Sequence, residues 1–247
     1  MSNKPLKCTY EAIQLEAEQF ASDYRDKIGL PKLPDEKSLQ PYKQIIEQRY
    51  PEVVKLIKVR LAQVESDPGH GFEHLEWVAC LAGYIADIET EGKNHKEKKE
   101  IISKAILTGL LHDIERHMGW GEPHTIAGEK TSRELLSKLN LVDEDVLTAI
   151  RHHDDMNYDF GGNETLRIIY GSVFDADHFR YGLERADTFW NMKQKRGVLP
   201  QEVIHDYAFL PPFRNTWKTK YGKIVGPQFV DYGMAIAKHI EDKFSNG

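Results

Sequence analysis

The residues best suited to chemistry are an adjacent histidine and aspartate, His112 and Asp113, which end the apolar run 105–111. Two ionisable side chains at the end of a buried helix lose hydration, and something must compensate for that loss. A metal ion is the commonest such partner, because imidazole nitrogen and carboxylate oxygen are both ligands of first-row metals. The alternative is that His112 only interacts with the helix dipole and that Asp113 makes a local turn.

Two further histidines, His70 and His74, lie four residues apart where an earlier apolar helix begins. If that helix already includes position 70, both side chains share one face. Taken alone, His74 would more often be a core or surface histidine, and the alternative for His70 is an exposed cap residue. Their spacing keeps a role at the metal site open for both.

An acidic pair, Asp175 and Asp177, follows another apolar run, 166–173. Two carboxylates at the end of an apolar helix offer a hard oxygen ligand that can complete an imidazole-rich shell. The alternatives are helix capping or a salt bridge with Arg180 or Arg185. The spacing does not decide which of the two aspartates is the ligand.

In this order the three groups resemble the HD superfamily of metal-dependent phosphohydrolases. The segment 70–78 is similar to the opening motif of that family, 110–114 to its signature His-Asp pair, and 174–177 to its closing aspartate. The resemblance covers residues 66–195, and the chain departs from it at Glu115, where the family usually has glycine. It implies a shell of four metal ligands, which are His74, His112, Asp113 and Asp177.

Superfamily members with two metals use extra histidines, and the aspartate of the His-Asp pair bridges the ions. Here His124 begins the helix after the His-Asp loop, and His152 and His153 end the following helix. Val146, Ile150 and His153 share a face of that helix, whereas His152 is offset. His124 and His153 are therefore candidate ligands of a second ion, with His152 a lesser candidate. The alternative is that all three are surface or capping histidines.

The resemblance implies hydrolysis of a phosphate ester or anhydride in a nucleotide or another small phosphorylated metabolite. Asp113 is expected to be a ligand, bridging if two ions bind, and His70 to donate a proton to the leaving oxygen. A histidine-rich shell favours one or two Mn, Fe, Co, Ni or Zn ions over Mg. Four arginines close in sequence to the ligands are expected to bind the phosphate or else to form surface ion pairs, namely Arg116, Arg151, Arg180 and Arg185.

Two other functions stay open at this stage. A di-iron oxygenase of the type that myo-inositol oxygenase exemplifies uses the same helical scaffold, and it would need iron bound to His124 and His153. A non-catalytic sensor that binds a metal or a nucleotide would show no turnover at all.

The apolar spacing predicts an all-α fold, an HD-domain-like helical bundle with an N-terminal helical extension. From Phe72 to Ile88 the apolar residues recur at steps of three and four, and no alternating strand of useful length is found. The predicted division places the N-terminal helical extension at 1–65 and the metal-binding core at 66–195. A C-terminal helical segment, packed on the core, is expected at 196–247.

Composition narrows the class of protein further. Apolar residues make up 40% of the 247 residues, and the formal net charge is −6, so no nucleic-acid surface is expected. Two cysteines are too few for a disulfide framework or a thiolate metal site. Because no segment reads as a signal peptide or a membrane span, a cytoplasmic protein without a membrane partner is expected.

Three prolines predict a connector between helices over 29–41.

Overall fold

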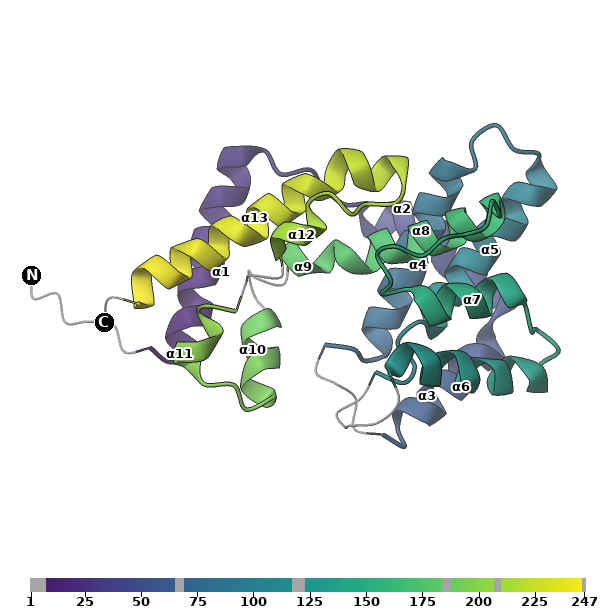
Figure 1. Ribbon diagram of the computed structural model, residues 1–247, viewed down its shortest axis with the longest axis horizontal. Coiled ribbons are helices and arrows are strands. Elements are labelled where there is room, and N and C mark those ends of the chain that lie inside the picture. Colours follow the sequence, from purple (N-terminus) through teal and green to yellow (C-terminus); the bar gives the residue numbers. More distant parts are fainter. Residues whose placement is uncertain (1–7, 65–68, 117–122, 184–187, 207–209, 246–247) are drawn as a thin grey trace, which may run out of the picture. The chain divides into compact units, whose positions relative to one another are not determined.

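The structure is a computed structural model that describes residues 8–64, 69–116, 123–183, 188–206 and 210–245. Within these ranges every regular element is a helix and none is a strand (Figure 1). The all-α class predicted from the apolar spacing is therefore confirmed.

Two compact units make up the chain, and each is described by itself. The central unit consists of residues 33–177 and 218–221, and the terminal unit of residues 1–32, 178–217 and 222–247. All six predicted metal ligands belong to the central unit. The domain limits expected from the sequence stay predictions.

The central unit is built from α2 (Glu36–Arg49), α3 (Pro51–Leu61), α4 (Phe72–Glu89), α5 (His95–Leu111), α6 (His124–Lys138), α7 (Glu144–His152) and α8 (Glu164–His178), whose last residue belongs to the terminal unit. The terminal unit contains α1 (Tyr10–Ile28), α9 (Arg180–Leu183), α10 (Thr188–Lys195), α11 (Pro200–Val203), α12 (Leu210–Phe213) and all but the first two residues of α13 (Lys220–Phe244).

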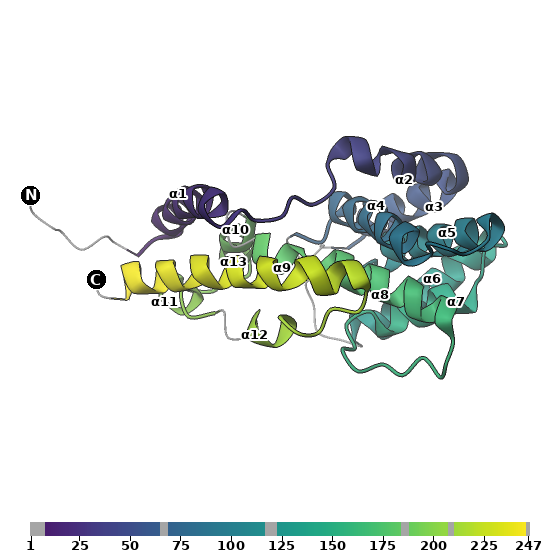
Figure 2. The same cartoon turned by 90° about the horizontal axis from the view of Figure 1, so that it is seen from above.

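Helices α4 and α5 lie side by side and form the core of the central unit (Figure 2). Their facing side chains are apolar and fully buried, among them Leu75, Val78 and Leu110. The close approach depends on Gly109, where a Cβ atom would lie only 2.6 Å from Cα of Ala79. Glycine therefore lets the C-terminal end of α5 come close to the N-terminal part of α4.

The start of α2 differs from the sequence expectation. The connector predicted over 29–41 is shorter, because α2 begins at Glu36. Asp35 caps this helix by accepting a hydrogen bond of 2.8 Å from the amide of Ser38, which satisfies one of the unpaired donors at the helix start. Pro41 lies inside α2, so the prediction that the connector extends to this proline was wrong.

In the terminal unit, α1 and α13 pack against each other. Tyr232 of α13 donates a hydrogen bond of 3.2 Å to the carbonyl oxygen of Ala21. Glu16 of α1 pairs with His239 at 2.7 Å and with Lys243 at 2.8 Å. In the part of the chain that is described, no helix is long and apolar enough to span a membrane.

Candidate metal centre

The predicted metal ligands lie at the ends of helices in the central unit. Side chains at helix ends project beyond the packed helix body, yet rigid elements hold them in place. The positions are the first turn of α4 (His74), the C-cap of α5 and the next residue (His112, Asp113), the first residue of α6 (His124), the C-cap of α7 (His153) and the last turn of α8 (Asp177).

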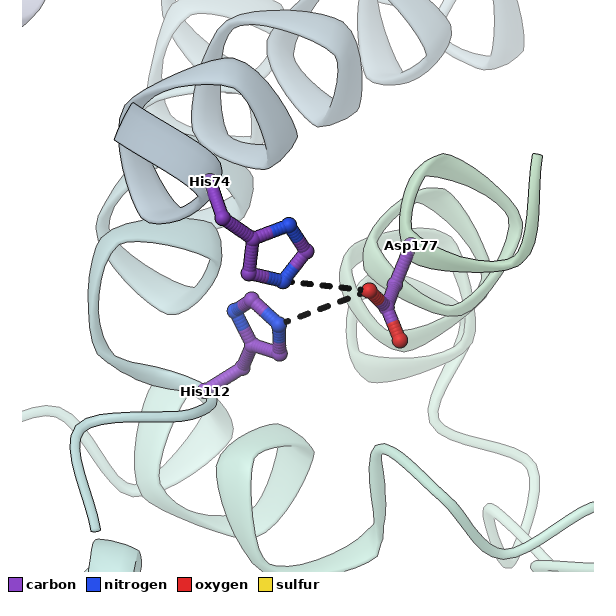
Figure 3. Close-up of side chains that lie close together, drawn as sticks. All are labelled: His74, His112 and Asp177. Atoms are coloured by element: carbon purple, nitrogen blue, oxygen red, sulfur yellow. Dashed lines mark ion pairs between the residues drawn. The ribbon is translucent and has the colours of Figure 1, made fainter. Parts of the chain in front are cut away.

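Cluster 1 consists of His74, His112 and Asp177, whose potential ligand atoms all lie within 4.8 Å of one another. Figure 3 shows both imidazoles pointing toward the carboxylate from α8. Oδ1 of Asp177 is 3.3 Å from Nε2 of His74 and 3.8 Å from Nε2 of His112. None of the three side chains is more than 8% exposed, so the group is shielded from water.

Cluster 2 consists of Asp113, His124 and His153, whose potential ligand atoms also lie within 4.8 Å of one another. Oδ1 of Asp113 is 3.2 Å from Nε2 of His153 and 3.4 Å from Nε2 of His124. The two imidazole nitrogens are 3.3 Å apart. The side chains of Asp113 and His153 are each 2% exposed, whereas that of His124 is 22% exposed. Cluster 2 is thus the more open of the two.

Asp113 connects the two clusters. Its Oδ1 belongs to cluster 2, whereas its Oδ2 lies 3.5 Å from Nε2 of His112 and 3.8 Å from Nε2 of His74. Each oxygen of one carboxylate therefore faces two imidazoles of a different cluster. This is the arrangement in which a carboxylate bridges two metal ions.

The separations within the clusters fit a shared cation better than direct hydrogen bonds. Most exceed the distance of about 2.7 to 3.2 Å that is usual for N–H···O bonds. Two ligand atoms that each lie about 2.1 Å from one ion are about 3.0 to 3.4 Å apart at octahedral or tetrahedral angles. The observed values of 3.2–3.8 Å are close to that range. The donor set therefore fits divalent metal ions.

The backbone fixes which nitrogen two of the imidazoles present. Nδ1 of His112 is 2.8 Å from the carbonyl oxygen of Gly109, and Nδ1 of His153 is 2.7 Å from that of Ile150. Because a carbonyl oxygen only accepts, each Nδ1 is the donor, and a neutral ring then turns the lone pair of Nε2 toward the centre. Nε2 of His112 is buried without a hydrogen-bond partner among the described residues. A metal ion would satisfy it.

The two buried carboxylates remain ionised. Burial works against ionisation of Asp113, but the nearby imidazoles of His112, His153 and His74 hold the pKa of its carboxyl well below the usual range. Burial likewise opposes ionisation of Asp177, and the imidazoles of His112 and His74, which face its carboxylate, hold its pKa well below the usual range. Two buried negative charges require nearby positive charge, which either protonated imidazoles or metal ions supply.

The structure separates Asp175 from Asp177. Asp175 is fully buried and accepts hydrogen bonds of 2.9 Å from the amide of Lys218, 2.8 Å from the amide of Thr219 and 2.6 Å from the hydroxyl of Thr219. Burial raises the pKa of Asp175 to about 6 despite these donors. Its carboxylate thus anchors the chain where α13 begins at Lys220, and Asp177 is the one that faces the imidazoles.

Asp154 is a site residue that the sequence reasoning missed. Its Oδ2 lies 3.1 Å from Nε2 of His124, and its Oδ1 lies 3.6 Å from Nε2 of His153. Burial opposes its ionisation, but the charge of His153 and a hydrogen bond from His124 lower the pKa of Asp154 to about 2. The sequence feature that could have indicated Asp154 is that His153 and Asp154 form a second His-Asp pair. Arg116 adds positive charge beside it, with Nη1 3.4 Å from Oδ2 of Asp154 and 3.1 Å from Nε2 of His124.

Glu115, where the chain departs from the family pattern, serves to hold the His-Asp turn. Nε and Nη2 of Arg60 donate to its two carboxylate oxygens at 2.7 and 2.6 Å, and the hydroxyl of Thr131 donates at 2.7 Å. The Glu115 side chain is only 4% exposed, so this bidentate pair is strong. These hydrogen bonds connect Glu115, two residues after Asp113, to α3 through Arg60 and to α6 through Thr131.

His70 lies beside cluster 1 although it precedes α4 instead of forming part of it. Its Nε2 is 3.8 Å from Oδ2 of Asp113, and its ring centroid is 5.4 Å from that of His74. The residue is 6% exposed. The chain thus brings His70 to the centre without the shared helix face that the spacing suggested.

The other sequence candidates lie outside the clusters. Arg151 is partly exposed and donates to Glu129 at 2.9 Å, and His152 stacks on Tyr158 with ring centroids 3.9 Å apart. Arg180 is buried and belongs to the terminal unit. Arg185 lies outside the described residues.

Comparison with known protein families identifies this part of the chain. Residues 71–179 match the family model of the HD domain. This segment is an HD domain. An HD domain implies metal-dependent activity of the phosphohydrolase type, and the two His/Asp clusters inside it are candidate metal sites. No curated protein and no solved structure matches the chain.

Proposed function

We propose that the HD domain of this chain binds two divalent transition-metal ions and hydrolyses a phosphate ester or anhydride bond in a nucleotide or another small phosphorylated metabolite. The observation that carries the proposal is the position of Asp113, whose Oδ2 faces both imidazoles of cluster 1 and whose Oδ1 faces both imidazoles of cluster 2. His74, His112 and Asp177 would hold one ion with Oδ2 of Asp113. His124 and His153 would hold the other with Oδ1 of Asp113.

The donor set indicates which ions would bind. Four imidazoles and two carboxylates favour Mn, Fe, Co, Ni or Zn over Mg, which prefers oxygen ligands and retains several waters. Bound ions of this kind lower the pKa of a coordinated water and polarise a phosphoryl oxygen. The buried walls of cluster 1 exclude bulk water, which strengthens the electrostatic interaction of the centre with an anionic substrate.

Two side chains of this chain would act on the substrate beside the ions. His70 is next to cluster 1 and carries a titratable nitrogen, so we assign it the donation of a proton to the leaving oxygen. The guanidinium of Arg116 is partly exposed beside cluster 2, where it would bind a phosphate oxygen. Arg151 and Arg180 stay secondary candidates for phosphate binding.

The proposal is tested by removing the metal with a chelator and reloading the full chain with each of the five ions in turn. The substrates are a chromogenic phosphomonoester, a chromogenic phosphodiester and nucleoside mono-, di- and triphosphates. We expect hydrolysis of at least one substrate, increasing with ion content up to about two ions per chain. If a chain that holds two ions hydrolyses none of them, the proposal is wrong, and the oxygenase and the sensor are the alternatives that replace it.

Arg116→Gln separates phosphate binding from ion binding. We expect KM to rise by about tenfold or more, with ion content unchanged, because one charge-assisted pair to the phosphate is lost. Arg133→Gln is the matched control, since Arg133 pairs with Glu129 and Glu144 on an exposed surface. An unchanged KM in Arg116→Gln would remove Arg116 from the substrate site.

The presence of both clusters also suits the di-iron oxygenase, which needs His124 and His153 as ligands. The two enzymes differ in what they require. The hydrolase works without oxygen and with several ions, whereas the oxygenase needs iron and oxygen. Anaerobic iron loading followed by exposure to oxygen, with electron paramagnetic resonance to detect a mixed-valent pair, would reveal the oxygenase.

A further inference from the structure

The two clusters are unequal in donors and in charge. The three ligand atoms of cluster 1 lie beside a fourth, Oδ2 of Asp113. The negative charge of Asp177 belongs to this cluster alone, and the charge of Asp113 is shared with cluster 2. Among the described residues, cluster 2 itself consists of three ligand atoms, and the carboxylate that it contains is the shared Asp113. A divalent ion held by two neutral imidazoles and half of a carboxylate would be poorly neutralised.

Asp154 lies where it would correct this inequality. Its two oxygens face the same two imidazole nitrogens that Oδ1 of Asp113 faces, at 3.1 Å from His124 and 3.6 Å from His153. Those separations are of the same size as the 3.4 and 3.2 Å found for Oδ1 of Asp113. The Asp154 side chain is 35% exposed, so it has room to adjust when an ion binds.

We propose that Asp154 is the fourth protein ligand of the ion at cluster 2, an inference that rests on the two-ion centre of the proposed function. Each ion would then have four protein ligands, with one carboxylate of its own and a share of Asp113. The pair His153-Asp154 would serve the second ion as His112-Asp113 serves the first. The expected consequence is that Asp154 controls the affinity of the second ion and leaves the first unaffected.

A competing role for Asp154 is to pair with Arg116, whose Nη1 is 3.4 Å from Oδ2. The two roles predict different effects of removing Arg116. If Asp154 acts only through that pair, Arg116→Gln should weaken the second ion as much as Asp154→Asn does. If Asp154 is a ligand, removing a nearby positive charge should leave the second ion as tightly bound as before or bind it more tightly.

The test measures binding of Co²⁺ to the full chain after the metal has been removed, and it does not depend on any enzymatic activity. Calorimetry gives the affinity of each equivalent, elemental analysis after gel filtration gives the number of ions retained, and visible absorption reports the coordination of Co²⁺. The variants are Asp154→Asn, Asp154→Glu and Arg116→Gln. Asp155→Asn is the matched control, because Asp155 is the next residue and accepts a hydrogen bond from the amide of Asn157 that asparagine can retain.

In Asp154→Asn we expect the first equivalent of Co²⁺ to bind as in the wild type and the second to bind at least about tenfold more weakly. Asp154→Glu, which restores a carboxylate, should recover part of that affinity, and Asp155→Asn should match the wild type. Wild-type affinity for both ions in Asp154→Asn would overturn the inference. So would an equal loss in Arg116→Gln.

The inference and the proposed function fail in different ways. If the wild-type chain binds two ions and binding of the second depends on Asp154, the inference is supported. If that chain hydrolyses no phosphate, the proposed function is overturned. If the wild-type chain hydrolyses phosphate and the Asp154→Asn variant still retains the second ion, the function is supported and the inference is overturned. A wild-type chain that takes up only one ion overturns both the two-ion centre and the role of Asp154.

Discussion

The carbonyl oxygen of Gly109 accepts a hydrogen bond of 2.8 Å from Nδ1 of His112. The same glycine lets α5 approach α4 so closely that a Cβ atom would lie 2.6 Å from Cα of Ala79. One residue without a side chain therefore sets both the helix spacing and the orientation of an imidazole. Backbone partners of this kind fix the tautomer and the direction of metal-binding histidines.

Gly109→Ala should disturb cluster 1. Alanine is intrinsically better in a helix, but here its methyl group meets the backbone of α4 and the helices must separate. We expect a loss of about 1 to 3 kcal/mol in the free energy of unfolding, together with weaker binding of the first ion. Urea titration and elemental analysis measure the two effects.

Gly128→Ala is the control for that change. Gly128 lies in α6, and its nearest contact to an added Cβ atom is 3.5 Å, which is ordinary van der Waals distance. This variant should be as stable as the wild type or more so, by up to about 1 kcal/mol. If both variants behave alike, the close approach at Gly109 does not hold the site together.

The imidazoles of the two clusters should affect different ions. His153→Ala should lose the second ion and retain the first, because Nε2 of His153 faces Oδ1 of Asp113. His74→Ala should weaken the first ion, because Nε2 of His74 is 3.3 Å from Asp177. Each loss should be at least about tenfold in affinity, measured by calorimetry with Co²⁺. Identical binding profiles for the two variants would mean that the centre holds a single ion.

Much of the centre was predictable from sequence because its residues lie at the ends of apolar helices. The helix periodicity placed His112, Asp113 and Asp177 at such ends, and the order of the motifs indicated an HD domain. Asp154 was missed because its partners come from two helices, and no local periodicity shows that His124 will face it. The same limit applies to Asp175, whose partners Lys218 and Thr219 lie more than 40 residues later in the chain.

Asp175 and Asp177 should separate stability from metal binding. Asp175→Ala leaves the buried amide and hydroxyl of Thr219 and the part-buried amide of Lys218 without their acceptor, so we expect a loss of roughly 2 to 3 kcal/mol in the free energy of unfolding. Asp177→Asn should instead reduce the affinity of the first ion by at least about tenfold with a smaller change in stability. The prediction fails if Asp175→Ala loses the first ion while remaining as stable as the wild type.

The contact between α1 and α13 should make stability depend on pH. The hydrogen bond from Lys243 is the main cause that holds the pKa of Glu16 below its usual range, and His239 adds to it. A depressed pKa in the folded state contributes stability above the unfolded pKa of about 4.3, and this stability is lost as the pH falls through the folded value.

Glu16→Gln tests this pH dependence in the terminal unit. At pH 7 the variant should be less stable than the wild type by about 1 kcal/mol, because the partly buried ion pair with Lys243 is lost and the hydrogen bond with His239 is weakened. The difference should shrink as the pH falls below the unfolded pKa of about 4.3 and Glu16 becomes protonated, so the two urea curves should converge at a pH below the lowered folded pKa. A difference that persists unchanged at that pH would show that the carboxylate charge is not its cause.

Elemental analysis of purified Asp113→Ala beside the wild type decides whether Asp113 bridges two ions. We expect about two divalent ions per wild-type chain. In Asp113→Ala, which removes a ligand from both clusters, we expect metal retention and phosphate hydrolysis to be lost. The exposed Asp23→Ala on α1 is the control and should match the wild type. An Asp113→Ala chain with wild-type metal content and activity would show that Asp113 bridges no ions.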